Sequence, residues 1–228
     1  VASILQMATG VSVGMIIVPF LAMISYTLVP TPIIFASLIL TIMMSIKGKE
    51  HIDLHNTPLV SVGMLVGIFM ALFLFDNIKS DYLGLVFGLL ILVSVFISIK
   101  IEKFQLSNTL NFIGGVSAGF MGSVAAVGGQ ILALLFQNHP LDSIKATLAF
   151  LYTIFSIVML SIFYYFDQFS YEQMISGLYM MPGFIIGFLI APRFSHYFKE
   201  QHAKPIVLLM AVIGSLLLIG KSVVTNFL

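Results

Sequence analysis

The sequence is poor in charged residues and contains neither cysteine nor tryptophan, and each shortage restricts what the protein can be. Only 8% of its 228 residues are charged, whereas soluble domains carry about 25%. Because 60% of the residues are hydrophobic, a soluble fold is excluded, and we predict an all-α, polytopic membrane protein. The formal net charge of +1 provides no strongly basic surface for nucleic acid.

The absence of cysteine excludes disulfides, thiolate metal sites and cysteine nucleophiles. The long apolar runs contain no Asp, Glu or His, so an intramembrane protease would lack both a catalytic pair and metal ligands. The histidines all fall in predicted loops, with a spacing that fits no metal site: His51, His55, His139, His196 and His202. We therefore expect no enzymatic activity, no metal and no cofactor.

Charged residues separate long uncharged runs, and these runs predict the membrane-spanning helices. The first half, residues 1–103, is expected to hold a glycine-interrupted segment at 1–25 and spans at 30–46, 58–75 and 82–99. The second half, residues 104–228, is expected to hold an interrupted segment at 104–138 and spans at 145–166, 173–192 and 205–225.

Matching residues in the two halves indicate an internal duplication. Gly14 corresponds to Gly129, and Ala36-Ser37-Leu38 corresponds to Ala146-Thr147-Leu148. Each half also has a face of small residues four apart, which favours close helix packing: Gly63, Gly67 and Ala71 against Gly183, Gly187 and Ala191. Three crossings per half would invert the second half relative to the first.

The uncharged run 104–141 is 38 residues long, which is too long for one span of about 20 residues. If the run forms a re-entrant hairpin, eight of the ten basic residues share one side of the membrane: Lys47, Lys49, Lys100, Lys103, Lys145, Arg193, Lys199 and Lys204. If the run instead crossed the membrane once, neither side would carry an excess of basic residues. The positive-inside rule therefore predicts the hairpin, and the repeat predicts an equivalent one at 1–25.

Glycines interrupt the apolar stretch 119–150 at Gly122 and at the pair Gly128-Gly129. Non-helical backbone at membrane depth is tolerated where it lines a protein-enclosed cavity, and transporters place their binding sites at such breaks. The stretch therefore predicts the substrate site of a transporter.

The glycine motifs and the helices that follow them resemble the sulfite exporter TauE/SafE family, over nearly the whole chain. The second half carries Gly119, Gly122, Gly128 and Gly129, then Lys145-Ala146-Thr147, and the first half carries Gly10, Gly14, Val18-Pro19-Phe20-Leu21 and Ala36-Ser37-Leu38. The sequence departs from the family's pattern at Gln130 and Leu134, where a glycine and a proline are typical. The resemblance implies transport of small anions such as sulfite or organosulfonates, in a cell membrane of the bacterial inner-membrane type.

Backbone N–H groups at the ends of half-helices can bind an anion without a buried cation. We expect the anion to contact glycines of both interruptions together with nearby hydroxyl and amide groups: Gly10, Ser12, Gly14, Ser37, Ser123, Gly128, Gly129, Gln130 and Thr147. The alternatives are that the glycines only permit helix packing, and that Ser37 and Thr147 bond to their own helices.

Several alternatives stay open at this stage. A passive anion channel can use the same half-helices, and a non-transporting membrane protein is a further candidate. If protons are coupled to transport, His139 and Asp142 are the nearest titratable groups. The small and aromatic surfaces of 58–75 and 173–192 suit a homodimer as well as internal packing.

Overall fold

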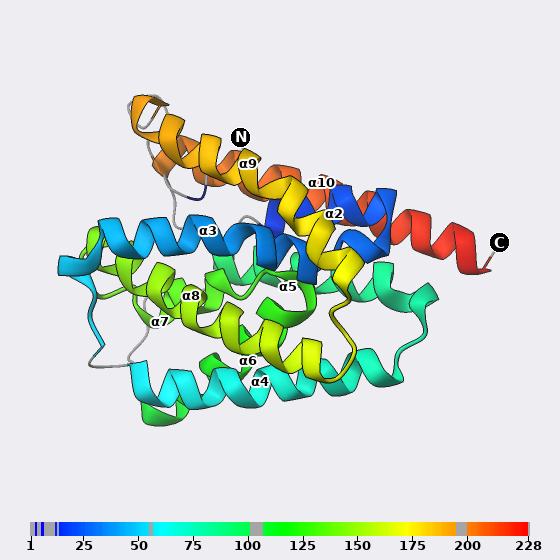
Figure 1. The fold of residues 1–228 in the computed structure, drawn as a ribbon, viewed down its shortest axis with the longest axis horizontal. Helices are drawn as coiled ribbons and strands as arrows, with labels where there is room; N and C mark the ends of the chain where they lie inside the picture. The colour runs from blue at the N-terminus through cyan, green and yellow to red at the C-terminus, as the bar shows by residue number, and fades with distance from the viewer. Residues whose placement is uncertain are drawn as a thin grey trace.

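The computed structural model describes residues 3, 6, 12, 14–54, 57–100, 107–194 and 200–227. Within these residues the chain is helical and contains no strand (Figure 1). The helices are α2 (Gly14–Ile24), α3 (Thr31–Lys47), α4 (Thr57–Asn77), α5 (Leu83–Lys100), α6 (Asn108–Ala125), α7 (Gly129–Leu135), α8 (Leu141–Tyr165), α9 (Tyr171–Phe194) and α10 (Glu200–Phe227).

Six segments are long and apolar enough to cross a membrane, so the predicted all-α membrane architecture is confirmed. They are Tyr26–Lys47, Thr57–Asn77, Ser80–Ile99, Leu141–Tyr165, Tyr171–Pro192 and Pro205–Val224. Helix α8 begins at Leu141, four residues before the expected start at residue 145. Asp142 lies in its first turn, where the helix dipole stabilises a negative charge, so this charge does not end the helix.

The chain reverses direction between α6 and α7, inside the bundle. A methyl group added at Gly114 would contact the side chain of Leu135, and one added at Gly128 would overlap the Ala118 carbonyl oxygen. The end of α7 therefore lies beside the first half of α6, and its start lies beside the last two turns of α6. Helices α6 and α7 are therefore antiparallel, as a hairpin requires, while the re-entry of residues 104–138 from one side of the membrane stays a prediction.

Helices α4 and α6 pack backbone against backbone. A methyl group added at Gly63 or Gly67 would overlap carbonyl oxygens of α6, and one added at Gly119 would overlap the Met64 carbonyl oxygen of α4. Because no side chain separates the two backbones, α6 is held against a spanning helix along much of its length. The small-residue face of the first half thus serves helix packing.

The corresponding face of the second half is used differently. A methyl group added at Gly187 would contact Ser3, whereas one added at Gly183 would have no described atom within 4 Å. Ten residues of the segment 1–25, all of them before α2, lie outside the described residues, which include α2 but only three residues before it. The first hairpin, the boundary between repeats and the inverted repeat therefore stay predictions.

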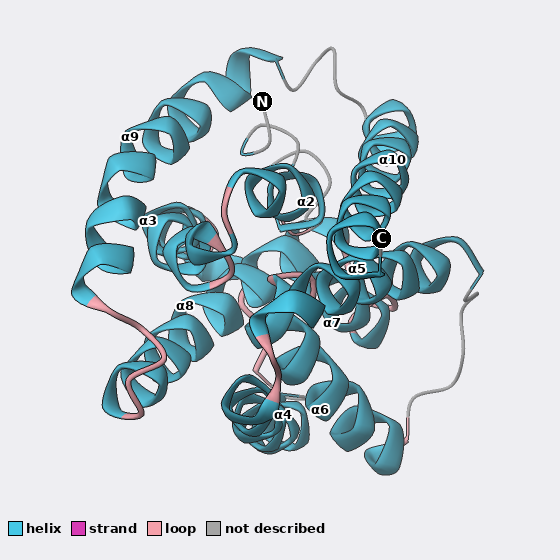
Figure 2. Cartoon of the chain, turned by 90° about the vertical axis from the view of Figure 1, so that its right-hand side faces the viewer, coloured by secondary structure: helices cyan, strands magenta, loops and turns pink. Residues whose placement is uncertain are grey.

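The loops gather at two ends of the bundle, and Figure 2 shows the short helices α2 and α7 near its middle. One end holds the loop after α3 and the loop after α7, which are joined by Asp53 and His139. The other end holds the segment before α3 and the end of α10, where Lys221 donates to the Met23 carbonyl oxygen at 2.7 Å.

The two small-residue faces predict different responses to the same substitution. Gly67→Ala should lower the melting temperature of the purified protein, because overpacking two helices in contact costs about 1–3 kcal/mol. Gly183→Ala should not lower it, because its methyl group meets no described atom and alanine favours the helix by up to about 1 kcal/mol. If thermal unfolding in detergent shows that the two variants lower the melting temperature equally, the result would contradict the observed packing of α4 on α6.

Candidate functional site

Helix α6 ends because Ala126 adopts a left-handed backbone conformation, with φ 54° and ψ 30°. This conformation is strained for alanine and is more often occupied by glycine. It turns the chain toward Gly128, the N-cap residue of α7. No side chain caps the N-terminus of α7 at this position. The short segment 126–128 is thus the non-helical backbone that the glycines of this region predicted.

The start of α2 lies directly against this break. The Ser12 hydroxyl donates to the Ala126 carbonyl oxygen and accepts from the Gly14 N–H at 3.3 Å. A methyl group added at Gly14 would overlap the Ala126 backbone, and one added at Gly129 would lie 3.1 Å from the Ser12 Cβ. The start of α2 and the break between α6 and α7, far apart in sequence, therefore meet, and Ser12 satisfies polar groups of both.

A cavity of about 80 Å³ adjoins this meeting point. Its walls come from the segment before α2 and from helices α2, α3, α4, α6 and α8. Seven of its lining side chains carry a hydroxyl or an amide group, and none is charged: Gln6, Ser12, Ser37, Thr41, Ser123, Tyr152 and Ser156. Such a cavity can hold a polar solute by hydrogen bonds alone.

Five of the nine residues predicted to bind substrate line this cavity: Ser12, Gly14, Ser37, Ser123 and Gly128. Gly10 lies outside the described residues. Ser37 also donates to the Ile34 carbonyl oxygen at 3.1 Å, as the alternative of bonding to its own helix anticipates. Gly129, Gln130 and Thr147 are not among the lining residues.

Gln130 is buried behind the cavity instead of facing it. Its amide nitrogen donates to the sulfur of Met15, and its carbonyl oxygen accepts from Ser94 at 3.4 Å. Ser94 also donates to the Val127 carbonyl oxygen at 2.9 Å, within the segment between α6 and α7. These bonds tie α2, α5 and α7 together around the chain break.

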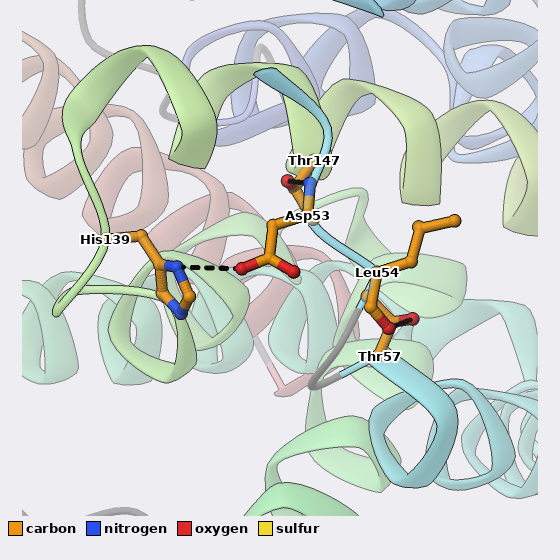
Figure 3. A network of polar contacts seen from close by, with 5 residues as sticks. All are labelled: Asp53, Leu54, Thr57, His139 and Thr147. Carbon is orange, nitrogen blue, oxygen red and sulfur yellow. Dashed lines mark hydrogen bonds and ion pairs between the residues drawn. The ribbon is translucent and has the colours of Figure 1, made fainter. Parts of the chain in front are cut away.

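Thr147 belongs to a polar network at one end of the bundle (Figure 3). Its hydroxyl oxygen accepts from the Asp53 N–H at 2.9 Å, and the Asp53 carboxylate lies 3.1 Å from Nδ1 of His139. His139, which the sequence places in a loop, is therefore paired with Asp53. The network joins the loop after α3 to the start of α8.

Tyr152 is the principal residue that the predicted set omits. Its hydroxyl group is buried and has no hydrogen-bond partner among the described residues, although Tyr152 lines the cavity. A methyl group added at Gly129 would overlap this hydroxyl, so Tyr152 reaches the chain break from α8. The signal in the sequence was a polar side chain inside an apolar span.

A protein-family model described as Sulfite exporter TauE/SafE matches residues 1–218 of the chain. The chain belongs to the sulfite exporter TauE/SafE family. No curated protein and no solved structure matches it. Because the members of this family are membrane transporters, the protein is a membrane transporter rather than an enzyme, as expected.

The glycines that carry the resemblance to TauE/SafE proteins border the cavity. Gly119, Gly122 and Gly128 line it, and Gly129 lies against Ser12 and Tyr152. The TauE/SafE motif in the second half thus marks one wall of this cavity. The first-half motif contributes Gly14 to the same lining, against the Ala126 backbone.

The contact between the two chain interruptions can be tested by cross-linking. Ser12→Cys with Gly129→Cys should form a disulfide, because a Cβ at position 129 would lie 3.1 Å from the Ser12 Cβ, close to the roughly 3.5–4.5 Å that the bond requires. After cleavage at a protease site inserted in 76–81, the fragments should stay joined until reduced. Ser12→Cys with Gly220→Cys is the control, since no described atom lies within 4 Å of a methyl group at Gly220. A disulfide that forms in the control pair but not between positions 12 and 129 would contradict the contact between Ser12 and Gly129.

Proposed function

We propose that this protein is a secondary transporter that exports small anions, sulfite or organosulfonates. The anion binds in the cavity of about 80 Å³ beside the α6–α7 break, which we call the central cavity. The observation that carries the proposal is the position of the cavity. It lies where the start of α2 meets the break between α6 and α7, and it is lined by uncharged polar groups. Interrupted helices meeting inside a membrane protein are typical of transporter substrate sites.

The size of the cavity suits a small oxyanion. Its volume is about 80 Å³. One water needs roughly 10–15 Å³ on the same scale, so a four-atom anion such as sulfite would fit with a few waters. A longer organosulfonate would require the surrounding side chains to move.

The donors around the cavity suit an anion held without a counter-ion. The hydroxyl of Tyr152 lacks a partner among the described residues and would gain one by donating to the anion. Ser123 and Ser156 add hydroxyl groups that can rotate to donate. Hydrogen bonds to a charged acceptor are stronger than those between neutral groups, so a few donors can replace a buried lysine or arginine.

Alternating access would require one end of the cavity to open at a time. The network of Asp53, His139 and Thr147 connects the proposed first repeat to the second at one end of the bundle. Opening that end by moving one repeat against the other would break this connection. We infer that the network stabilises the state in which this end is closed, and its histidine offers one route for protons to influence transport.

The proposed function is tested by flux into proteoliposomes with sulfite, sulfate, sulfonates and carboxylates, with and without a pH gradient. A carrier should show saturable flux of one anion class and accelerated exchange when the same anion is present on both sides. Saturable flux without exchange acceleration would favour a passive channel. Absence of flux for every anion, with folded and inserted protein, would refute the proposal.

Tyr152→Phe tests the assignment of the cavity. Removing the hydroxyl should raise the half-saturation concentration by about tenfold or more, because a hydrogen bond to a charged group contributes roughly 1.5–3 kcal/mol. Tyr164→Phe, the same change on an exposed position of α8, is the matched control and should leave transport unchanged. If both variants match the wild-type half-saturation concentration, the anion does not bind at Tyr152.

A further inference from the structure

A second cavity, of about 380 Å³, lies at the end of the bundle remote from the Asp53 network. It is bounded by the segment before α3, by the loop between α4 and α5 and by the loop between α8 and α9. Its lining includes no charged side chain but many uncharged polar ones: Ser25, Tyr26, Thr27, Thr31, Ser80, Gln168 and Gln173. We call this cavity the vestibule.

Helix α3 begins at the vestibule without a capping side chain. Its N-cap is Pro30, which makes no side-chain capping bond, and Pro32 lies within the first turn. Proline has no N–H group, so the donors left at this helix end are the N–H groups of Thr31 and Ile33. Both residues are buried, so these donors have little access to bulk water.

Thr31 adds an independent observation at the same place. Its side chain is only 2% exposed, and its hydroxyl group has no hydrogen-bond partner among the described residues. A buried hydroxyl without a partner is unfavourable unless a ligand or water satisfies it. Thr31 lines the vestibule, so a solute in the vestibule could bond to it together with the helix N-terminus.

The vestibule and the central cavity share their walls along three helices. On α3, Thr31 lines the vestibule and Ile34 lines the central cavity. On α8, Phe163 lines the vestibule and Met159, one turn away, lines the central cavity. On α4 the corresponding residues are Phe75 and Ile68. The two cavities are therefore stacked along the bundle, with apolar side chains between them.

We propose that Thr31 and the N-terminus of α3 form a second oxyanion-binding subsite, through which the transported anion passes between the central cavity and the vestibule side of the membrane. This inference rests on the proposed function. The positive end of the helix dipole favours an anion over a neutral solute, and the Thr31 hydroxyl supplies a directed donor. The rings of Phe75 and Phe163, edge to face with their centroids 5.8 Å apart, form an apolar part of the vestibule's lining.

The subsite is tested with Thr31→Val, which removes the hydroxyl while keeping the shape of the side chain. Flux is measured with sulfite in vesicles carrying the protein in one orientation. A Lys49→Cys background reports that orientation through an impermeant thiol reagent, since the chain has no native cysteine and Lys49 is exposed at the opposite end. Thr31→Val should raise the half-saturation concentration about tenfold for sulfite presented at the vestibule side. For sulfite presented at the opposite side of the membrane, the half-saturation concentration of Thr31→Val should differ from that of the wild type by less than about twofold.

Three comparisons make the result specific. Thr31→Ser keeps a hydroxyl and should restore wild-type behaviour, and Thr31→Ala should reproduce the loss if Thr31→Val does not fold. Thr153→Val is the matched control: Thr153 lines neither cavity, and its hydroxyl donates to the Ala149 carbonyl oxygen at 2.8 Å. Wild-type half-saturation in Thr31→Val from both sides, with wild-type flux intact, would overturn the subsite and leave the proposed function standing. If the wild-type protein carries no anion, both fail.

A lipid phosphate carries the same oxyanion chemistry, and vesicle composition separates the two sources. In vesicles of phosphatidylcholine alone and in vesicles with added phosphatidylglycerol, a subsite for the transported anion predicts the same effect of Thr31→Val. An effect that appears only with phosphatidylglycerol would assign the subsite to a lipid headgroup and overturn its role in transport.

Discussion

The contact between the start of α2 and the break that separates α6 from α7 is the constraint on which the rest of this structure depends. Where the chain is not helical inside a membrane, its backbone N–H and carbonyl groups need partners from the protein. Ser12 provides such partners on both sides, by donating to the Ala126 carbonyl oxygen and accepting from the Gly14 N–H. Glycine at position 14 lets the two backbones approach, and the packing of α4 on α6 holds one of them in place. The cavity lies beside this contact, and Ser12, Gly14 and Ala126 line it.

The absence of charge from the cavity has a functional consequence. A buried lysine or arginine would be expensive inside the membrane and would bind an anion tightly enough to slow its release. Hydroxyl groups and helix ends bind more weakly, and they are distributed over the central cavity and the vestibule. A transporter of small anions needs binding that is strong enough to select its substrate and weak enough to release it.

Much of this arrangement could be predicted from the sequence, because its strongest signals are local. Uncharged runs bounded by charges predict spans, and the glycines at 122 and 128 predict an interrupted helix. The direction of each side chain was not predictable. Helix α7 is apolar apart from Gln130, so its sequence does not indicate which face meets the cavity, and Gln130 instead bonds to Met15 and Ser94. Thr147 lies on the same helix as Tyr152 but five residues nearer one end, about 7 Å along the axis, and reaches the loop network instead.

The most direct measurement is a crystal structure of the protein with selenite, an oxyanion close to sulfite whose selenium gives an anomalous signal. The account predicts an anomalous peak in the central cavity, within hydrogen-bond distance of the Tyr152 hydroxyl and the serine hydroxyls around it. A preparation that transports selenite but shows its anomalous peak away from both the central cavity and the vestibule would contradict the account.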